Sequence, residues 1–207
     1  MDTDKRAFLA RTLGPLLGVA LVCAVLLLIA DELARERIAD NARREQLKII
    51  DEVMTLPYDN DLYTDVIEVV DAAYLGSSGN VKVYRARRDG EPAGLVLMPV
   101  TARGYSGNIQ LVIGIAYDGA LTGVRVLSHR ETEGLGDGID QRKSNWITGF
   151  SGHSLDNTPP DGWAVTSAGG EFDQVSGATI SSRGVINAVR NSLEYYRLNR
   201  DRLYLPQ

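Results

Sequence analysis

The chain has 207 residues, a formal net charge of −5 at pH 7, and 44% hydrophobic residues. The acidic balance excludes the basic field that attracts nucleic acid, so we expect no nucleic-acid partner. The single cysteine, Cys23, excludes a disulfide within the chain and a thiolate metal site, and two histidines are too few for a zinc site. We therefore expect no metal.

An uncharged, mostly apolar stretch from Leu13 to Ala30 predicts a single transmembrane anchor. As a helix it would span about 27 Å, enough for a hydrocarbon core. A cleaved signal peptide is disfavoured because its apolar core is shorter and ends at a small-x-small site. A lipoprotein signal would place a small residue before Cys23, where Val22 stands. Basic residues flank the stretch on both sides, so local charge leaves its orientation open.

Apolar residues recur at near-helical spacing after the anchor, from Leu33 to Met54, and predict a helix over 31–54 that acts as a solvated stalk. A break follows at Pro57 and at residues 59–61. Residues 64–74 are predicted as a second, short helix, because their apolar side chains fall on one side of a helix.

Alternating residue types then predict four strands, over residues 81–85, 95–100, 109–117 and 121–127. Tight turns at Asp89-Gly90 and Asp118-Gly119 favour antiparallel pairing. The remaining predicted elements are a short helix over 141–150, two short strands over 163–166 and 171–173, and a C-terminal helix over 181–200. Strands followed by helices predict an α+β fold: an antiparallel sheet with packed helices, behind the N-terminal transmembrane helix.

Several motifs that are typical of enzymes are incomplete or absent. The glycines at 134–138 resemble a dinucleotide-binding fingerprint, but Ile139 stands where its third glycine belongs. No phosphate-binding loop of the GxxxxGK[ST] type and no GxSxG nucleophile motif is present. The incomplete fingerprint disfavours a nicotinamide site, and a free-standing flavin reductase, which would need such a site, is disfavoured with it.

The segment from Asp173 to Thr179 precedes the C-terminal helix and carries the chemistry. Gly177 and Ala178 allow a bulky ligand to approach the backbone closely. Free amide N–H groups at the start of the helix favour an anionic phosphate. Ordinary helix capping by Ser176 and Thr179 explains the same residues, so local physics leaves both interpretations open.

This segment resembles the signature of the FMN-binding domain family found in the Rnf and Na⁺-translocating NADH:quinone reductase complexes. That signature is an acidic residue and two variable positions followed by Ser/Thr-Gly-Ala-Thr, which here spans 173–179. Blocks at 104–109, 129–136 and 145–152 resemble other family segments in the same order, so the likeness covers most of residues 80–196. It is greatest to the branch formed by the G subunits of the Rnf complexes. Glu133 replaces a usual proline, and Ser181-Ser182 replaces a frequent Thr-Pro.

The resemblance implies one FMN attached covalently, by a phosphoester, to Thr179. The cofactor carries out the redox chemistry, so Thr179 is a tether and no residue is predicted to be catalytic. Asp173 and Ser176, with Gly177 and Ala178, would form the signature that a separate flavin transferase recognises. The loop that would approach the flavin ring contains Glu131, Thr132, Gly134, Leu135 and Gly136.

Three side chains are predicted to lie beside the flavin ring, and each has an expected role there. Tyr105 and Trp146 would stack on the ring or shield it, or would pack in the core instead. Glu131 close to the ring would disfavour the anionic reduced flavin by repulsion between like charges. The glycines of its loop would permit close backbone contact with the ring.

By resemblance, the chain is an electron-transfer subunit of a membrane-bound, ion-translocating oxidoreductase complex and is not catalytic alone. The implied partners are the membrane, the other Rnf subunits (B and D among them) and the flavin transferase. The implied segments are a cytoplasmic N-terminus (1–12), the anchor in the bacterial inner membrane (13–30), a helical stalk or linker (31–75) and a periplasmic FMN-binding domain (76–207). The alternatives are the flavin subunit of a Na⁺-translocating quinone reductase and a flavin-free extracytoplasmic binding or scaffold module.

Overall fold

The computed structural model describes residues 2–205, and the chain divides into two compact units, Met1–Gln46 and Leu47–Gln207. Residues 1, 206 and 207, at the outer ends of the predicted segments 1–12 and 76–207, lie outside the described part. The first unit is helical and belongs to α1 (Asp2–Val53), which confirms the predicted helix beyond the apolar stretch.

Within α1, Leu16–Arg35 is long and apolar enough to cross a membrane, with a mean hydropathy of 2.5 over side chains that are not buried. The side chains of Leu13, Gly14 and Pro15, with which the predicted span begins, lie outside the described part. Length and composition thus support the expected anchor.

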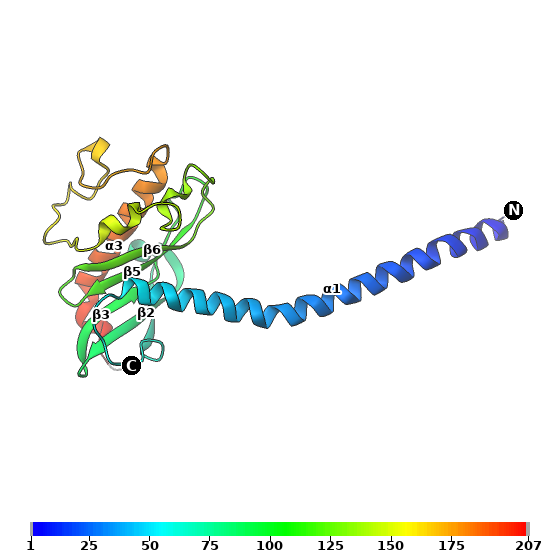
Figure 1. Cartoon of the computed structure of the whole chain (residues 1–207), viewed down its shortest axis with the longest axis horizontal. Helices are drawn as coiled ribbons and strands as arrows, with labels where there is room; N and C mark the ends of the chain where they lie inside the picture. Colours follow the sequence, from blue (N-terminus) through cyan, green and yellow to red (C-terminus); the bar gives the residue numbers. More distant parts are fainter. Residues whose placement is uncertain (1, 206–207) are drawn as a thin grey trace. The chain divides into compact units, whose positions relative to one another are not determined.

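The second unit contains one antiparallel sheet (Figure 1). Its strands are β1 (Val66–Asp71), β2 (Ser77–Arg88), β3 (Glu91–Leu97), β4 (Val100–Thr101), β5 (Ile109–Ala116) and β6 (Leu121–Ser128). The strands pair in the order β1-β2-β3-β5, while the short β4 pairs with the start of β5, and β6 also pairs with β5. The predicted antiparallel sheet is confirmed, and it is wider than the four predicted strands.

The predicted helix over residues 64–74 is wrong. Most of that segment is β1, and only α2 (Ala72–Leu75) is helical. The sequence of β1, VIEVVD, is rich in branched side chains that fit a pleated surface, and Val69 pairs with Val81 of β2. Asp71 then accepts the amide N–H groups of Ala73 and Tyr74 and thereby starts α2.

One face of the sheet packs against α3 (Thr179–Leu203), the predicted C-terminal helix (Figure 1). Leu97 and Ile113 of the sheet share a buried core with Val185 and Val189 of α3. The connection between β6 and α3 holds only the 3₁₀ turns η1 (Asp137–Ile139), η2 (Trp146–Phe150) and η3 (Thr166–Ala168). The predicted helix over 141–150 is therefore reduced to η2, and the two predicted short strands meet in a single bridge, Val165↔Phe172.

The opposite face of the sheet packs against the last turn of α1. Gly114 and Gly123 are paired in the sheet, and a Cβ atom on Gly114 would lie 2.4 Å from the carbonyl oxygen of Val53. The Thr122 hydroxyl donates a hydrogen bond of 2.5 Å to the same carbonyl. Residues 47–75, which the sequence places in the stalk, thus belong to the compact unit that contains the sheet.

Candidate functional site

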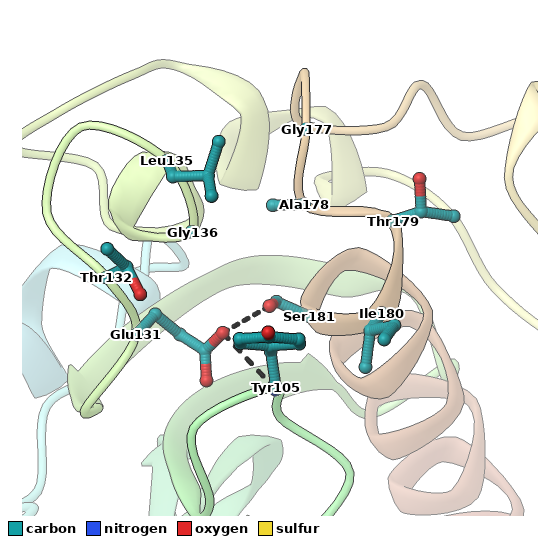
Figure 2. A pocket seen from close by; sticks show the side chains of 10 residues that line it. All are labelled: Tyr105, Glu131, Thr132, Leu135, Gly136, Gly177, Ala178, Thr179, Ile180 and Ser181. Carbon is teal, nitrogen blue, oxygen red and sulfur yellow. Dashed lines mark hydrogen bonds between the residues drawn. The ribbon is translucent and has the colours of Figure 1, made fainter.

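A cavity of about 360 Å³ opens beside the first turn of α3 (Figure 2). Its volume lies within the range of small-molecule pockets, roughly 300–1,000 Å³. Three segments form its wall: the loop before β5, the loop after β6, and the turn that begins α3. The lining residues are Tyr105, Glu131, Thr132, Leu135, Gly136, Gly177, Ala178, Thr179, Ile180 and Ser181. The structure therefore brings together, at one cavity, most of the residues that the sequence motifs predict.

The start of α3 has the properties of an anion site. Ala178 precedes the helix and provides no side-chain cap. The first intrahelical hydrogen bond runs from the Ser182 amide to the Ala178 carbonyl, at 3.0 Å, so the amides of residues 179–181 precede it. Such amides, together with the helix dipole, stabilise a phosphate.

Thr179 is the first residue of α3 and is half-buried at the edge of the cavity. Its side chain points away from Glu131 and Thr132 (Figure 2). The Thr179 hydroxyl donates a long hydrogen bond of 3.4 Å to Oε1 of Gln174, which also accepts the Ser167 hydroxyl at 2.7 Å. The hydroxyl is therefore only weakly held.

Large apolar side chains lie exposed around the cavity. Tyr105, Leu135 and Ile180 keep 70%, 50% and 53% of their surface in contact with solvent. Three such side chains at one cavity indicate a surface that a flat apolar ligand would cover. The phenol ring of Tyr105 also offers a face for stacking.

Glu131 is the buried acidic group of the cavity, with 6% of its surface exposed. Its carboxylate accepts hydrogen bonds from the amides of Tyr105, at 3.3 Å, and Ser106, at 3.0 Å, and from the Ser181 hydroxyl (Figure 2). One side chain thus connects the loop before β5, the loop after β6 and the first turn of α3.

Glycines on two sides make room for this glutamate. A Cβ atom on Gly104 would lie 2.7 Å from Oε1 of Glu131, and one on Gly136 would lie 2.9 Å from Cβ of Glu131. Gly136 thus accommodates Glu131 and also lines the cavity, where the sequence predicts that it approaches the flavin ring. Gly177 has a φ of +76°, which only glycine adopts readily, and a Cβ atom on it would lie 2.6 Å from Cδ1 of Leu135.

Comparison with known proteins gives the family. A family model described as FMN-binding domain matches residues 104–194. The chain is 42% identical over 171 residues to the G subunit of the ion-translocating oxidoreductase complex of Pseudoalteromonas atlantica, an alignment that covers 82% of this chain and 80% of that protein. The chain belongs to the family of G subunits of ion-translocating oxidoreductase complexes.

Other members of the family match over almost the whole chain. The G subunits of Aliivibrio fischeri and Vibrio cholerae are 37% and 36% identical, over 98% and 92% of this chain and 95% and 92% of their own length. Among solved structures, the C subunit of a Na⁺-translocating NADH-quinone reductase from Parabacteroides distasonis aligns with a TM-score of 0.44 and 24% identity, over 72% of each chain. The family match at 104–194 includes every residue that lines the cavity.

Four residues predicted for the site do not line the cavity. Asp173 and Ser176 are exposed in the segment that leads to Thr179, and Gly134 is exposed in the turn after Thr132. Trp146 donates from its indole Nε1 to the carbonyl of Asp173, at 2.6 Å, and so holds the start of the signature segment.

The turn that carries Leu135 forms without the family's usual proline. The carbonyl of Thr132 accepts three amide N–H groups, those of residues 135–137, at 3.2, 2.9 and 3.3 Å. The Gly134 amide holds the pKa of the buried Asp137 below its usual range, against the effect of desolvation. Glu133 is exposed and is accommodated in this turn.

Two of the lining residues, Ile180 and Ser181, are not among the site residues that the sequence motifs predict. Their signal in the sequence was their position directly after Thr179, within the first turn of the helix. An amphipathic pattern assigns side chains to the buried or the solvent face of a helix, and it does not identify those that face a cavity at the helix end.

Proposed function

We propose that this chain is the flavin-bearing electron-transfer subunit of an ion-translocating oxidoreductase complex, with one FMN joined by a phosphoester to Oγ1 of Thr179. The observation that carries the proposal is the position of Thr179, which starts α3 at the edge of the cavity with a weakly held hydroxyl. The family model for residues 104–194 supports FMN as the ligand.

The cavity fits both ends of FMN. The uncapped start of α3 suits the phosphate, which must lie next to Thr179 if it is esterified there. The exposed side chains of Tyr105, Leu135 and Ile180 suit the flat ring system. Because Gly177 and Ala178 carry little or no side chain, the ligand can approach the backbone between these two regions.

Bound FMN would supply reversible uptake and release of one or two electrons. The residues of the chain would then bind and orient the cofactor and exclude water from part of it. Thr179 would hold the phosphate end, and Tyr105, Leu135 and Ile180 would cover part of the ring. Proton transfer by a side chain is not required for this role, so the site needs no general acid or base.

We place this domain on the periplasmic side of the bacterial inner membrane, held by the apolar span Leu16–Arg35. The names of the relatives support assembly with other subunits of the complex, among which we include the B and D subunits. A separate flavin transferase would attach FMN taken from FAD, and Asp173 and Ser176 are exposed where such an enzyme could reach them.

Fluorescence of the denatured protein tests the covalent bond. Full-length protein coexpressed with the flavin transferase should give a fluorescent band on a denaturing gel, and Thr179→Ala should give none. Ser167→Ala is the matched control, because it removes the other hydroxyl bonded to Gln174 and lies outside the cavity. A dark band for the unaltered protein would favour the flavin-free binding module instead.

The alternative assignment, the flavin subunit of a Na⁺-translocating quinone reductase, makes a different prediction about partners. Purification of the membrane complex and identification of the copurifying chains distinguishes the two. Rnf-type subunits are expected, and quinone reductase subunits would contradict the proposal.

A further inference from the structure

We infer that Glu131 is a positioning residue for the flavin: it assembles the cavity from three separate segments and holds a fixed negative charge at its wall, which lowers the midpoint potential of the bound cofactor. This inference rests on the proposed function, because it concerns the same cavity.

The contacts of Glu131 account for the assembly. Its carboxylate accepts two amide N–H groups, those of Tyr105 and Ser106, and the Ser181 hydroxyl. Tyr105 and Ser181 line the cavity themselves, so these hydrogen bonds fix two of its walls relative to the loop that carries Glu131. Because Gly104 and Gly136 leave space that a Cβ atom would fill, the glutamate fits between the two loops.

The backbone of Glu131 is fixed as well. Its amide N–H donates a hydrogen bond of 3.1 Å to Nδ1 of His129. The other ring nitrogen, Nε2, faces a carboxylate oxygen of Asp140 at 3.9 Å. Both the main chain and the side chain of Glu131 are thereby held, and the carboxylate has a defined position at the cavity wall.

The negative charge of Glu131 has no cationic partner in the described part of the chain. All three of its donors are neutral groups, and among the side chains that the structure describes no lysine, arginine or histidine forms an ion pair with it. A buried carboxylate interacts more strongly with a neighbouring charge than an exposed one does, because the surrounding dielectric constant is lower. Electrons added to a ring in the cavity would therefore be disfavoured, as for any like charge.

Two substitutions should shift the midpoint potential in opposite directions. Glu131→Gln removes the charge while retaining one oxygen acceptor, and we expect a positive shift. Ser181→Ala retains the charge but removes a donor that partly screens it, and we expect a negative shift. A role limited to packing would not produce shifts of opposite sign. Glu133→Gln is the matched control, because Glu133 is exposed in the same loop and should leave the potential unchanged.

The experiment is a spectroelectrochemical titration of the purified full-length proteins after coexpression with the flavin transferase, with the loaded fraction measured by gel fluorescence. Potentials of Glu131→Gln and Ser181→Ala that equal that of the unaltered protein would overturn the inference. If Glu131→Gln takes up no FMN, Ser181→Ala decides: a negative shift supports the inference and no shift overturns it.

Failure of the proposed function is recognised separately. In that case the unaltered protein lacks covalent fluorescence, or the Thr179→Ala protein retains it, whatever the potentials of the Glu131 and Ser181 variants.

Discussion

Replacement of Trp146 by phenylalanine removes one hydrogen bond and keeps an aromatic ring. The indole Nε1 lies 2.6 Å from the carbonyl oxygen of Asp173, and the ring contacts Phe150 edge-on at 5.4 Å between centroids. A hydrogen bond of this kind contributes a net of about 0.5–1.5 kcal/mol. At about 1.4 kcal/mol per tenfold change, the equilibrium constant for docking of the segment from Asp173 to Thr179 should fall by about 2- to 12-fold.

The assay is the rate of covalent FMN incorporation at a limiting amount of flavin transferase. We expect Trp146→Phe to slow incorporation by up to this factor and to leave the native flavin fluorescence of the loaded protein unchanged. Trp163→Phe is the control, because the buried indole nitrogen of Trp163 makes no hydrogen bond with the residues that the structure describes, and its loss should not slow incorporation. Incorporation at the normal rate combined with brighter native flavin would refute the reasoning and place Trp146 on the ring.

Two further predictions concern stability. Gly114→Ala would place a Cβ atom 2.4 Å from the carbonyl oxygen of Val53, and overpacking of this kind costs about 1–3 kcal/mol, so the thermal unfolding midpoint should fall. The control Gly149→Ala, whose Cβ atom would meet no atom within 4 Å, should leave the midpoint unchanged. Equal midpoints for the two variants would contradict the close packing of Gly114 on Val53. Desolvation acts to raise the pKa of Asp140, but hydrogen bonds from Arg142 outweigh it and hold that pKa below the usual 3.8. The ionised Asp140 therefore stabilises the folded state above the usual pKa of 3.8, and this stabilisation is lost as the pH falls through the lowered pKa. The difference in unfolding free energy between the unaltered protein and Asp140→Asn should be smaller at about pH 3 than at about pH 7. An equal difference at both pH values would refute the lowered pKa of Asp140.

Much of the sheet could be predicted from the sequence, because alternating side chains and tight turns are local signals. The failure at β1 has a physical reason: Val66, Ile67 and Val70 also fit one side of a helix, so periodicity alone did not distinguish the two structures. The pairing of Val69 with Val81 decides between them, and that contact is between segments that the sequence pattern does not connect.

The candidate site could likewise be predicted only in part from the sequence. The position of Thr179 at the start of a helix could be predicted from the signature. Residue types alone left capping by Ser176 and Thr179 open, and the structure shows that Ala178 at the cap position makes no side-chain cap. The effect of the Glu131 charge on a nearby flavin could be predicted from the sequence. Its role in joining three segments could not, because that role depends on hydrogen bonds from Tyr105, Ser106 and Ser181. For Trp146, residue type alone does not distinguish contact with the flavin ring from packing in the core. Its hydrogen bond to the carbonyl of Asp173 is seen only in the structure.

The measurement that tests the covalent flavin most directly is the intact mass of the purified full-length protein, coexpressed with the flavin transferase and compared with Thr179→Ala. The unaltered protein should carry the added mass of one FMN less one water, and the variant should carry none. An unaltered protein without added mass, or a Thr179→Ala protein with it, would contradict the assignment of Thr179 as the site of attachment.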